Sequence, residues 1–298
     1  MKKVFLVGLL FITIVMQFLS SPTPANATSL SVWANYGSGV YYASNGLSVS
    51  LSSTSGSVIV YTTNGTTPQA RMVLYKTLVI TNGIKYTGPI MVTGNKQIRA
   101  IALKDIFTPV SPQASYSYEV YNPTGLANAA QSKFYSFNYK NYPFTAKYTA
   151  ANGSQGNFTM TYTGITPGTV NCTWYSFTRS KYNTGRDILF SSAGGLDGKN
   201  WFSKMYGNSL QMKYSGSSAL EDIIRAYGNR PIYNVVVTFN STSSNSAGHV
   251  MVIDAIINGK IYFSDNTRPG TWVIKNSVSE FKSYYSSSGA ILGAVVVR

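Results

Sequence analysis

The chain has one cysteine and one histidine among its 298 residues, and these two side chains have the strongest potential for chemistry. Cys172 stands where a helical pattern begins, and His249 opens an apolar segment 77 residues later. A thiol becomes nucleophilic when a helix N-terminus or a neighbouring imidazolium favours the thiolate. The two residues therefore predict a Cys–His pair that the fold assembles and that could attack an amide carbonyl.

Other site chemistries have fewer candidate residues. A zinc site would need two further ligands from nine acidic residues, and no segment has the alternating acidic residues of a calcium loop. An internal disulfide is excluded because there is no second cysteine. We therefore expect no metal and no cofactor. The competing interpretation is that Cys172 is a small buried hydrophobe, the usual state of a lone cysteine.

A helix and a strand must position the pair. Residues 172–182 have a helical pattern, and Gly185 would end that helix as its C-cap. Further helices are expected at residues 201–206 and 217–225, and strands at 233–239, 249–257, 260–264 and 291–297. Helices followed by antiparallel strands predict an α+β domain over residues 166–298.

The residue that would orient the histidine depends on a hairpin. If residues 258–259 (Asn-Gly) form a two-residue turn, side-chain alternation places Asn266 on the sheet face of His249. A loop one residue longer, with the glycine at a bulge, gives that place to Asp265. Asp254 lies at an odd offset from His249 on the same strand and should point away from it.

The first 27 residues have the features of a secretory signal peptide. Lys2 and Lys3 precede an apolar run over residues 4–19, and residues 25–27 (ANA) have the small-x-small pattern of a cleavage site. No second run approaches the length of a transmembrane helix. We therefore expect a secreted protein, extracellular or associated with the cell wall, whose mature chain is long enough for two domains.

The charge of the chain is strongly basic, with 24 Lys and Arg against 9 Asp and Glu and a formal net charge of +15 at pH 7. A basic extracellular protein is attracted to polyanions. The basic residues are scattered and form no recognisable nucleic-acid module, which disfavours nucleic acid as a partner. An anionic cell-wall polymer is the partner that fits best, and a contribution to solubility alone is the simpler explanation.

Residues 29–120 predict an all-β module. Short alternating segments are expected as strands at residues 47–51, 58–61, 98–103 and 115–120. Asn64-Gly65 is a turn signal, and Pro68 excludes an immediate central strand. Several short strands at turn-punctuated intervals predict a small sandwich.

Three segments of this module carry a family resemblance. Residues 61–68 (YTTNGTTP), 86–90 (YTGPI) and 98–102 (IRAIA) resemble the C-terminal module of chitobiases and β-hexosaminidases. The resemblance implies an immunoglobulin-like or fibronectin type III-like sandwich that serves as an accessory domain without catalysis. Residues 121–165, which follow it, are expected to form a linker with a short β extension of the second domain.

The surroundings of Cys172 and His249 carry a second resemblance. Residues 171–175 (NCTWY) with Arg179 resemble the cysteine motif of CHAP amidases and peptidases, and residues 248–253 (GHVMVI) resemble their histidine motif. Residues 259–266 (GKIYFSDN) resemble the strand that follows. The resemblance implies a papain-like domain, related to the NlpC-type hydrolases, that cuts amide bonds of peptidoglycan.

The sequence departs from the CHAP pattern in two places. CHAP members usually carry Glu at the position of Asp265, with Asn two residues later, whereas Asn266 follows directly here. Residues 219–239 look more like papain-like peptidases of the bacteriocin-processing type. Those peptidases place an Asp soon after a strand that follows the His, so the resemblance favours Asp265 as the orienting residue, with Asn266 as the alternative.

The sequence thus predicts a secreted cysteine hydrolase of peptidoglycan. The Cys172 thiolate would attack, His249 would hold it as an ion pair and protonate the leaving amine, and the Cys172 N–H would contribute to an oxyanion hole. Trp174 and Tyr175 would line the substrate groove or pack the helix core. Two alternatives stay open: a non-catalytic wall or glycan-binding protein, and a secreted cysteine peptidase or transglutaminase-like enzyme acting on protein.

Overall fold

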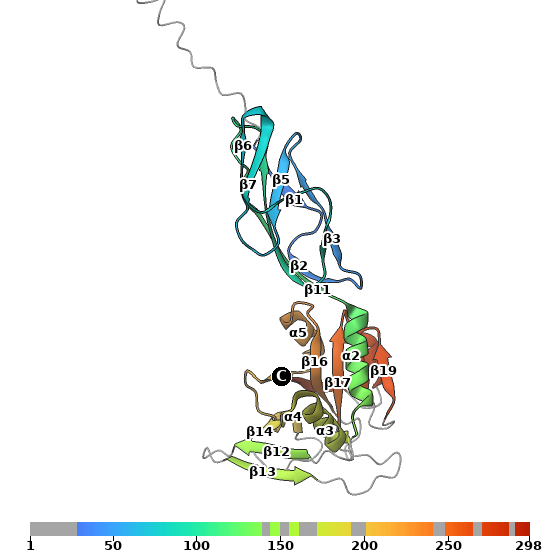
Figure 1. The fold of residues 1–298 in the computed structure, drawn as a ribbon. Helices are drawn as coiled ribbons and strands as arrows, with labels where there is room; N and C mark the ends of the chain where they lie inside the picture. Colours follow the sequence, from blue (N-terminus) through green and yellow to red (C-terminus); the bar gives the residue numbers. More distant parts are fainter. Residues whose placement is uncertain are drawn as a thin grey trace, which may run out of the picture. The chain divides into compact units, whose positions relative to one another are not determined.

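The computed structural model gives the protein two compact units (Figure 1). The described residues are 29–138, 144–149, 155–160, 172–191, 201–240, 248–264, 270–285 and 290–298. The first unit contains residues up to 38, 48–90 and 96–117, and the second contains residues 39–47, 91–95 and 118–298. The signal-peptide residues 1–27 lie outside the described part of the chain.

Short strands build the N-terminal half, as the sequence predicts. They are β1 (Val32–Ala34), β2 (Gly39–Tyr42), β3 (Leu47–Val49), β4 (Leu51–Ser53), β5 (Val58–Thr62), β6 (Gln69–Val73), β7 (Thr77–Asn82), β8 (Ile84–Lys85), β9 (Ile90–Val92), β10 (Asn95–Leu103) and β11 (Ala114–Tyr121), with a 3₁₀ turn η2 (Leu74–Lys76). A five-stranded sheet has the order β2-β11-β10-β5-β8, and the pairs β1-β4, β3-β9 and β6-β7 complete the set.

Strand β10 is buried on both of its faces. Ile98 and Ala100 are fully buried on one face, and Leu103 is buried on the other. The β6-β7 hairpin covers this second face, where its apolar side chains pack against Val60 and Leu103. The C-terminal part of the strand, residues 100–103, is therefore buried on both faces, because two layers of strands close over it.

The segment expected as a linker contains a helix instead. Helix α2 (Pro123–Tyr135) begins at Asn122, whose side chain accepts a hydrogen bond of 3.0 Å from the Gly125 N–H. Asn at the N-cap followed by Pro at the first helical position is a strong start signal. Leu126 and Ala130 pack against Ala255 and Ile257 of the second unit, and this burial makes the segment part of the domain.

The expected β extension is present after this helix. Strands β12 (Phe144–Thr149) and β13 (Gln155–Met160) pair antiparallel, and β14 (Leu189–Phe190) pairs parallel to β12. These three strands form a sheet of their own.

A six-stranded antiparallel sheet forms the centre of the second unit. Its order is β15 (Gln211–Ser215), β20 (Ile291–Val297), β16 (Ile232–Phe239), β17 (His249–Ile257), β18 (Lys260–Ser264) and β19 (Trp272–Lys275). The remaining helices are α3 (Cys172–Thr184), α4 (Trp201–Lys204), α5 (Ala219–Ala226) and α6 (Val278–Tyr284). The bounds of β17, β18 and β20 are those that hydrophobic patterning predicts, since these strands are nearly continuous apolar runs.

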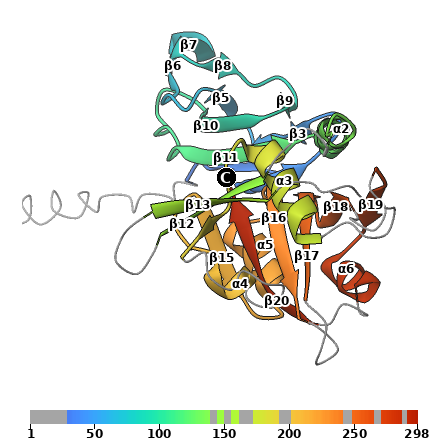
Figure 2. The same ribbon diagram turned by 90° about the horizontal axis from the view of Figure 1, so that it is seen from below.

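The two faces of this sheet carry different helices. Trp174 and Phe177 of α3 pack with Val250 and Val252 on one face. The apolar residues of α5 and Phe281 of α6 pack with Met251, Ile253 and Ile256 of β17 on the other face. Figure 2 shows α3 on one side of the sheet and α5 and α6 on the opposite side.

The hairpin between β17 and β18 combines a tight turn with a bulge. Residues 258–259 form a two-residue turn, with Ile257 opposite Lys260 and positive φ angles of 50° and 75°. The register then shifts by one residue, because Ala255 faces Tyr262 while Ile253 faces Phe263. The bulge therefore shifts the pairing register by one residue, which is the shift expected from a loop one residue longer.

This register bears on the choice between Asp265 and Asn266. If the strand continues in this register, side-chain alternation predicts that Asp265 shares the sheet face of His249. Both residues lie outside the described part of the chain, so the choice stays a prediction.

Candidate functional site

Cys172 is the first residue of α3, as the sequence predicts, and its side chain is half-buried. Its Sγ lies 3.9 Å from the Thr173 hydroxyl. A helix with 3.6 residues per turn places Cys172, Ser176, Arg179 and Asn183 on a single stripe. Ser176, Arg179 and Asn183 all form hydrogen bonds with residues of β17.

Hydrogen bonds fix the alignment of α3 with β17. The Ser176 hydroxyl donates to the carbonyl of Val250 at 3.0 Å, and the Asn183 amide donates to the Asp254 carboxylate at 2.9 Å. Helix and strand therefore run in the same direction. One helical turn is about 5.4 Å and a strand residue about 3.3 Å, so the turn before Ser176, which begins at Cys172, lies alongside the start of β17.

His249 is the first residue of β17, but its ring points to the face of the sheet opposite to α3. The imidazole lies 6.0 Å from the ring of Phe239 and is stacked on Tyr285 at 5.4 Å between centroids. Phe239 and Tyr285 belong to the core on the α5 and α6 side, whereas Val250 belongs to the core under α3. The structure thus brings Cys172 and His249 to the same end of the sheet and assigns their side chains to different faces.

Trp174 and Tyr175 are core residues in this structure. Their exposed fractions are 4% and 2%, and both belong to the apolar core on the α3 side of the sheet. This is the packing alternative that the sequence left open, and it leaves neither side chain on a substrate-facing surface. The third member of the site, Asp265 or Asn266, lies in residues that the structure does not describe.

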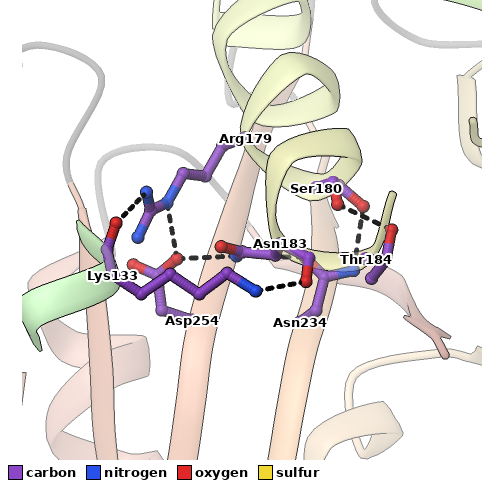
Figure 3. A network of polar contacts seen from close by, with 7 residues as sticks. All are labelled: Lys133, Arg179, Ser180, Asn183, Thr184, Asn234 and Asp254. Carbon is purple, nitrogen blue, oxygen red and sulfur yellow. Dashed lines mark hydrogen bonds and ion pairs between the residues drawn. The ribbon is translucent and has the colours of Figure 1, made fainter. Parts of the chain in front are cut away.

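Further along α3, a buried ion pair joins the helix to β17. Arg179 Nε donates to Asp254 Oδ1 at 2.7 Å, and the exposed fractions of the two side chains are 0% and 4% (Figure 3). The guanidinium also lies 5.1 Å and 5.0 Å from the ring centroids of Phe134 and Phe137. Burial raises the pKa of Asp254, and the neighbouring Arg179 opposes this rise.

Amide side chains extend this ion pair into a network. Asn183 donates to Asn234 Oδ1 at 3.3 Å, and Asn234 donates to the Ser180 hydroxyl at 2.9 Å. On the α2 side, the Lys133 ammonium donates to the Asn183 carbonyl at 2.6 Å. Figure 3 shows these residues meeting where α2, α3, β16 and β17 converge. The network holds α3 against the sheet, and the cysteine at the head of α3 is held with it.

This network could have been found from the sequence. Asp254 is a single carboxylate inside a nine-residue apolar strand, and Arg179 is a charge on a helix whose neighbours are aromatic. A buried charge needs a partner of opposite charge, so an ion pair between these two residues is the natural expectation. The expectation that Asp254 points away from His249 is confirmed. Among the described residues no group of three His, Cys, Asp or Glu side chains is placed to hold a metal ion.

We expect Ser176→Ala to loosen the contact between α3 and β17. The lost hydrogen bond leaves the buried Val250 carbonyl without this donor, which should cost about 1–2 kcal/mol of the free energy of unfolding. Urea unfolding of the purified chain measures it. Ser132→Ala, an exposed serine on α2, is the matched control and should change stability by less than about 0.5 kcal/mol. Equal stability of both variants would mean that Ser176 does not anchor the helix.

Comparison with protein families identifies one segment. Residues 49–112 match the family model described as Fn3 associated. This is an immunoglobulin-like type of module, in agreement with the fold class expected for the N-terminal half. The searches of curated proteins and of solved structures each found no match.

The Fn3-associated match ends well before the cysteine and histidine. It covers the strands from the end of β3 to the segment before β11, so it bears on the module and not on the chemistry of the second unit. None of the helices in the described residues is long and apolar enough to cross a membrane.

Proposed function

We propose that the chain is a secreted cysteine hydrolase that cleaves amide bonds in bacterial cell-wall peptidoglycan. The observation that carries this proposal is the placement of the single thiol at the N-terminus of α3, tied by Ser176 to the strand that His249 begins. A helix N-terminus favours a thiolate. The resemblance of residues 166–298 to papain-like CHAP and NlpC-type domains supplies the substrate class and belongs to the proposal.

The proposed reaction divides into two steps. The Cys172 sulfur attacks the amide carbonyl, a carbon–sulfur bond forms, and His249 gives its proton to the leaving amine as the carbon–nitrogen bond breaks. Water then attacks the thioester, and the thiol leaves with a proton returned through the imidazole. The Cys172 N–H stabilises the oxyanion, and Asp265, or else Asn266, orients the imidazole.

This mechanism requires the His249 ring to change its position. The ring must leave the stack with Tyr285 and move around the N-terminal end of β17 to reach the thiol on the other face of the sheet. His249 is the first residue of that strand and follows Gly248, so one strand end has to change for the pair to form. An imidazole that stays on the α6 side during turnover would rule out this pair.

A second candidate function is a wall or glycan-binding protein without turnover. The position of the His249 ring favours it, as does the Fn3-associated module, because modules of this immunoglobulin-like type commonly serve as accessory domains. A cysteine enzyme that acts on protein is the third possibility. Incubation with purified cell walls, followed by mass analysis of the released fragments, separates them.

Each candidate gives a different result in that experiment. New amine and carboxyl ends in wall fragments, lost after alkylation of the thiol, support the proposed hydrolase. Binding without fragments supports the second candidate, and cleavage of casein but not of walls supports the third. Alkylation is unambiguous here because the chain has one cysteine.

The Fn3-associated module should contribute wall binding through its exposed aromatic residues. Tyr75 is 99% exposed at the tip of the β6-β7 hairpin, and Phe107 is 88% exposed. Replacing both by alanine should reduce retention on purified walls by about 5-fold or more, because each lost aromatic contact is worth at least about 0.5 kcal/mol. A wall pull-down measures the change.

The matched control for this experiment is Tyr135→Ala. Tyr135 is 64% exposed on α2, outside the module, so its replacement should leave wall retention unchanged. Hydrolysis of a small soluble amide should be the same in all these variants. Undiminished retention of the Tyr75/Phe107 double variant would remove the module's aromatics from wall recognition.

A further inference from the structure

A cavity of about 590 Å³ lies in the second unit, away from the cysteine. Helices α2 and α3 and strands β16, β17 and β20 contribute to its lining. Small-molecule sites typically have volumes of about 300–1,000 Å³. The α3 residues that line the cavity, Arg179 and Asn183, lie seven and eleven positions after Cys172. At about 1.5 Å per residue, this separates the cavity from the thiol by roughly 10–16 Å.

One stripe of helix α2 supplies an apolar wall of the cavity. Its residues recur at the spacing that keeps side chains on a single helix face, and they are Leu126, Ala129, Ala130 and Lys133. The two alanines have short side chains, so space remains between the helix and the sheet. The wall is thus apolar along most of its length and ends on the ammonium of Lys133.

Two tyrosines add aromatic surface to the lining. Tyr233 of β16 is 44% exposed, and Tyr227, which follows α5, is half-buried. The centroid of the Tyr227 ring lies 5.1 Å from Arg298 Cζ, and the Tyr227 hydroxyl accepts a hydrogen bond from Arg298 Nε at 2.9 Å. An apolar or aromatic ligand would therefore find rings beside a guanidinium that is held in place.

Two cations of the lining have N–H groups to spare. Lys133 Nζ donates to the Asn183 carbonyl at 2.6 Å (Figure 3), which uses one of its three N–H groups. Arg298 donates through Nε to Tyr227, and its Nη1 and Nη2 have no partner among the described residues. Lys133 and Arg298 are both exposed, so a ligand can reach these donors.

A row of hydrogen-bonded residues connects the two cations. Asn183, whose carbonyl accepts from Lys133, donates to Asn234 Oδ1 at 3.3 Å. Asn234 in turn donates to the carbonyl of Val297 at 3.3 Å, directly before Arg298. All five residues line the cavity. Lys133 and Arg298 therefore stand at the two ends of one polar row along its wall.

The charges of the lining select the head group of a ligand. Arg179 and Asp254 form a buried ion pair at 2.7 Å, so their charges cancel. Lys133 and Arg298 are the other charged side chains in the lining, and both are positive. One positive charge remains even when the α-carboxylate of Arg298 is counted. The cavity therefore attracts an anion and repels a cation.

We propose that this cavity binds an organic acid with an apolar or aromatic body. The carboxylate accepts hydrogen bonds from Nη1 and Nη2 of Arg298, because guanidinium and carboxylate match each other in a two-bond arrangement. Lys133 adds positive charge to the same wall, and the body of the ligand lies against the α2 stripe and the two tyrosines. This site is independent of the proposed hydrolase activity, since none of its groups belongs to the proposed Cys172–His249 machinery.

Three aromatic probes test the head group on the full chain. Phenylacetate, phenylacetamide and phenethylamine share a phenyl ring and a methylene group and differ in the polar end. Ligand-observed NMR with titration should show phenylacetate bound about 10-fold more tightly than phenylacetamide, because hydrogen bonds to ionised groups are roughly twice as strong as neutral ones. Phenethylamine should bind least. Any other order, or no binding of phenylacetate, overturns the proposal.

Two tryptophan variants test the location. Ala129 and Ser132 are both exposed on α2, but only Ala129 is among the cavity-lining residues. Ala129→Trp should abolish phenylacetate binding by filling the space beside the α2 stripe, and Ser132→Trp should leave it unchanged. Loss of binding in both variants, or in neither, overturns the assignment.

Charge variants test the two cations. Arg298→Met should reduce the preference for phenylacetate over phenylacetamide, and the double variant Arg298→Met/Lys133→Met should remove it. Lys104→Met is the matched control, since Lys104 is an exposed lysine of the first unit, and it should leave the preference unchanged. All three positions are exposed, so each protein should fold, and thermal unfolding checks this. A preference that persists in the double variant, or that disappears in Lys104→Met, overturns the proposed contact.

Discussion

Replacement of Cys172 by serine should abolish wall hydrolysis while the protein stays folded. The serine hydroxyl is far harder to ionise than a thiol, so no anion is ready to attack the carbonyl. Loss of the nucleophile in enzymes of this type lowers kcat by about 10⁴-fold or more. Release of soluble fragments from purified walls, followed with time, measures the effect.

The control for this variant is its fold and its binding. Cys172 is half-buried and its Sγ lies 3.9 Å from the Thr173 hydroxyl, so an oxygen in its place should cost less than about 1.5 kcal/mol. Thermal unfolding and wall pull-down should therefore match the wild-type protein. Hydrolysis at the wild-type rate in the serine variant would exclude a cysteine mechanism, and the absence of hydrolysis in both proteins would favour the binding protein.

Removal of Arg179 should have the largest effect on stability. Arg179→Leu leaves the Asp254 carboxylate buried without its cation, which should cost about 3–5 kcal/mol. For a unit of this size the Tm should fall by on the order of 10 °C. The double variant Arg179→Leu/Asp254→Leu should recover much of this loss, because it buries no charge. Calorimetry of the two variants and the wild-type protein completes the comparison.

The effect of Arg179→Leu should depend on pH in a definite direction. Burial already raises the pKa of Asp254 above its ordinary value of 3.8, and Arg179 is the main influence that lowers it. Without Arg179 the folded state holds a proton that the unfolded chain releases, so stability is lost as pH rises and regained as pH falls toward 3.8. The destabilisation should therefore be larger at pH 8 than at pH 4.5. A deficit that does not change with pH would mean that the carboxylate is not the cause.

The fold of the second unit was largely predictable from residue patterns. Residues 249–257 and 260–264 are apolar runs interrupted by Asn-Gly, and they form two strands with the expected bounds. Gly185 ends α3 with a positive φ of 71°, as a C-cap glycine should. Such features are local, since each depends on the sequence of a single element. Helix α2 is equally local, because its Asn-Pro start is a helix signal within one short segment.

The candidate site was predictable only in its residue types. The sequence by itself determined that the one possible nucleophile is Cys172, that it begins a helix, and that His249 begins a strand. Alternation along that strand also determined that His249 and Asp254 point to opposite faces. These conclusions need only the chemistry of the side chains and the period of each element.

Tertiary structure decided which side chains meet. It placed α3 on the face of the sheet that Asp254 occupies, so the helix bearing Cys172 is fastened by Arg179 and the His249 ring packs on Tyr285. It also put a bulge between Ile253 and Ala255, which changes the register of the pairing with the following strand. Neither result can be read from one element, because the choice of face depends on which apolar surfaces bury each other, and residues distant in sequence share that burial.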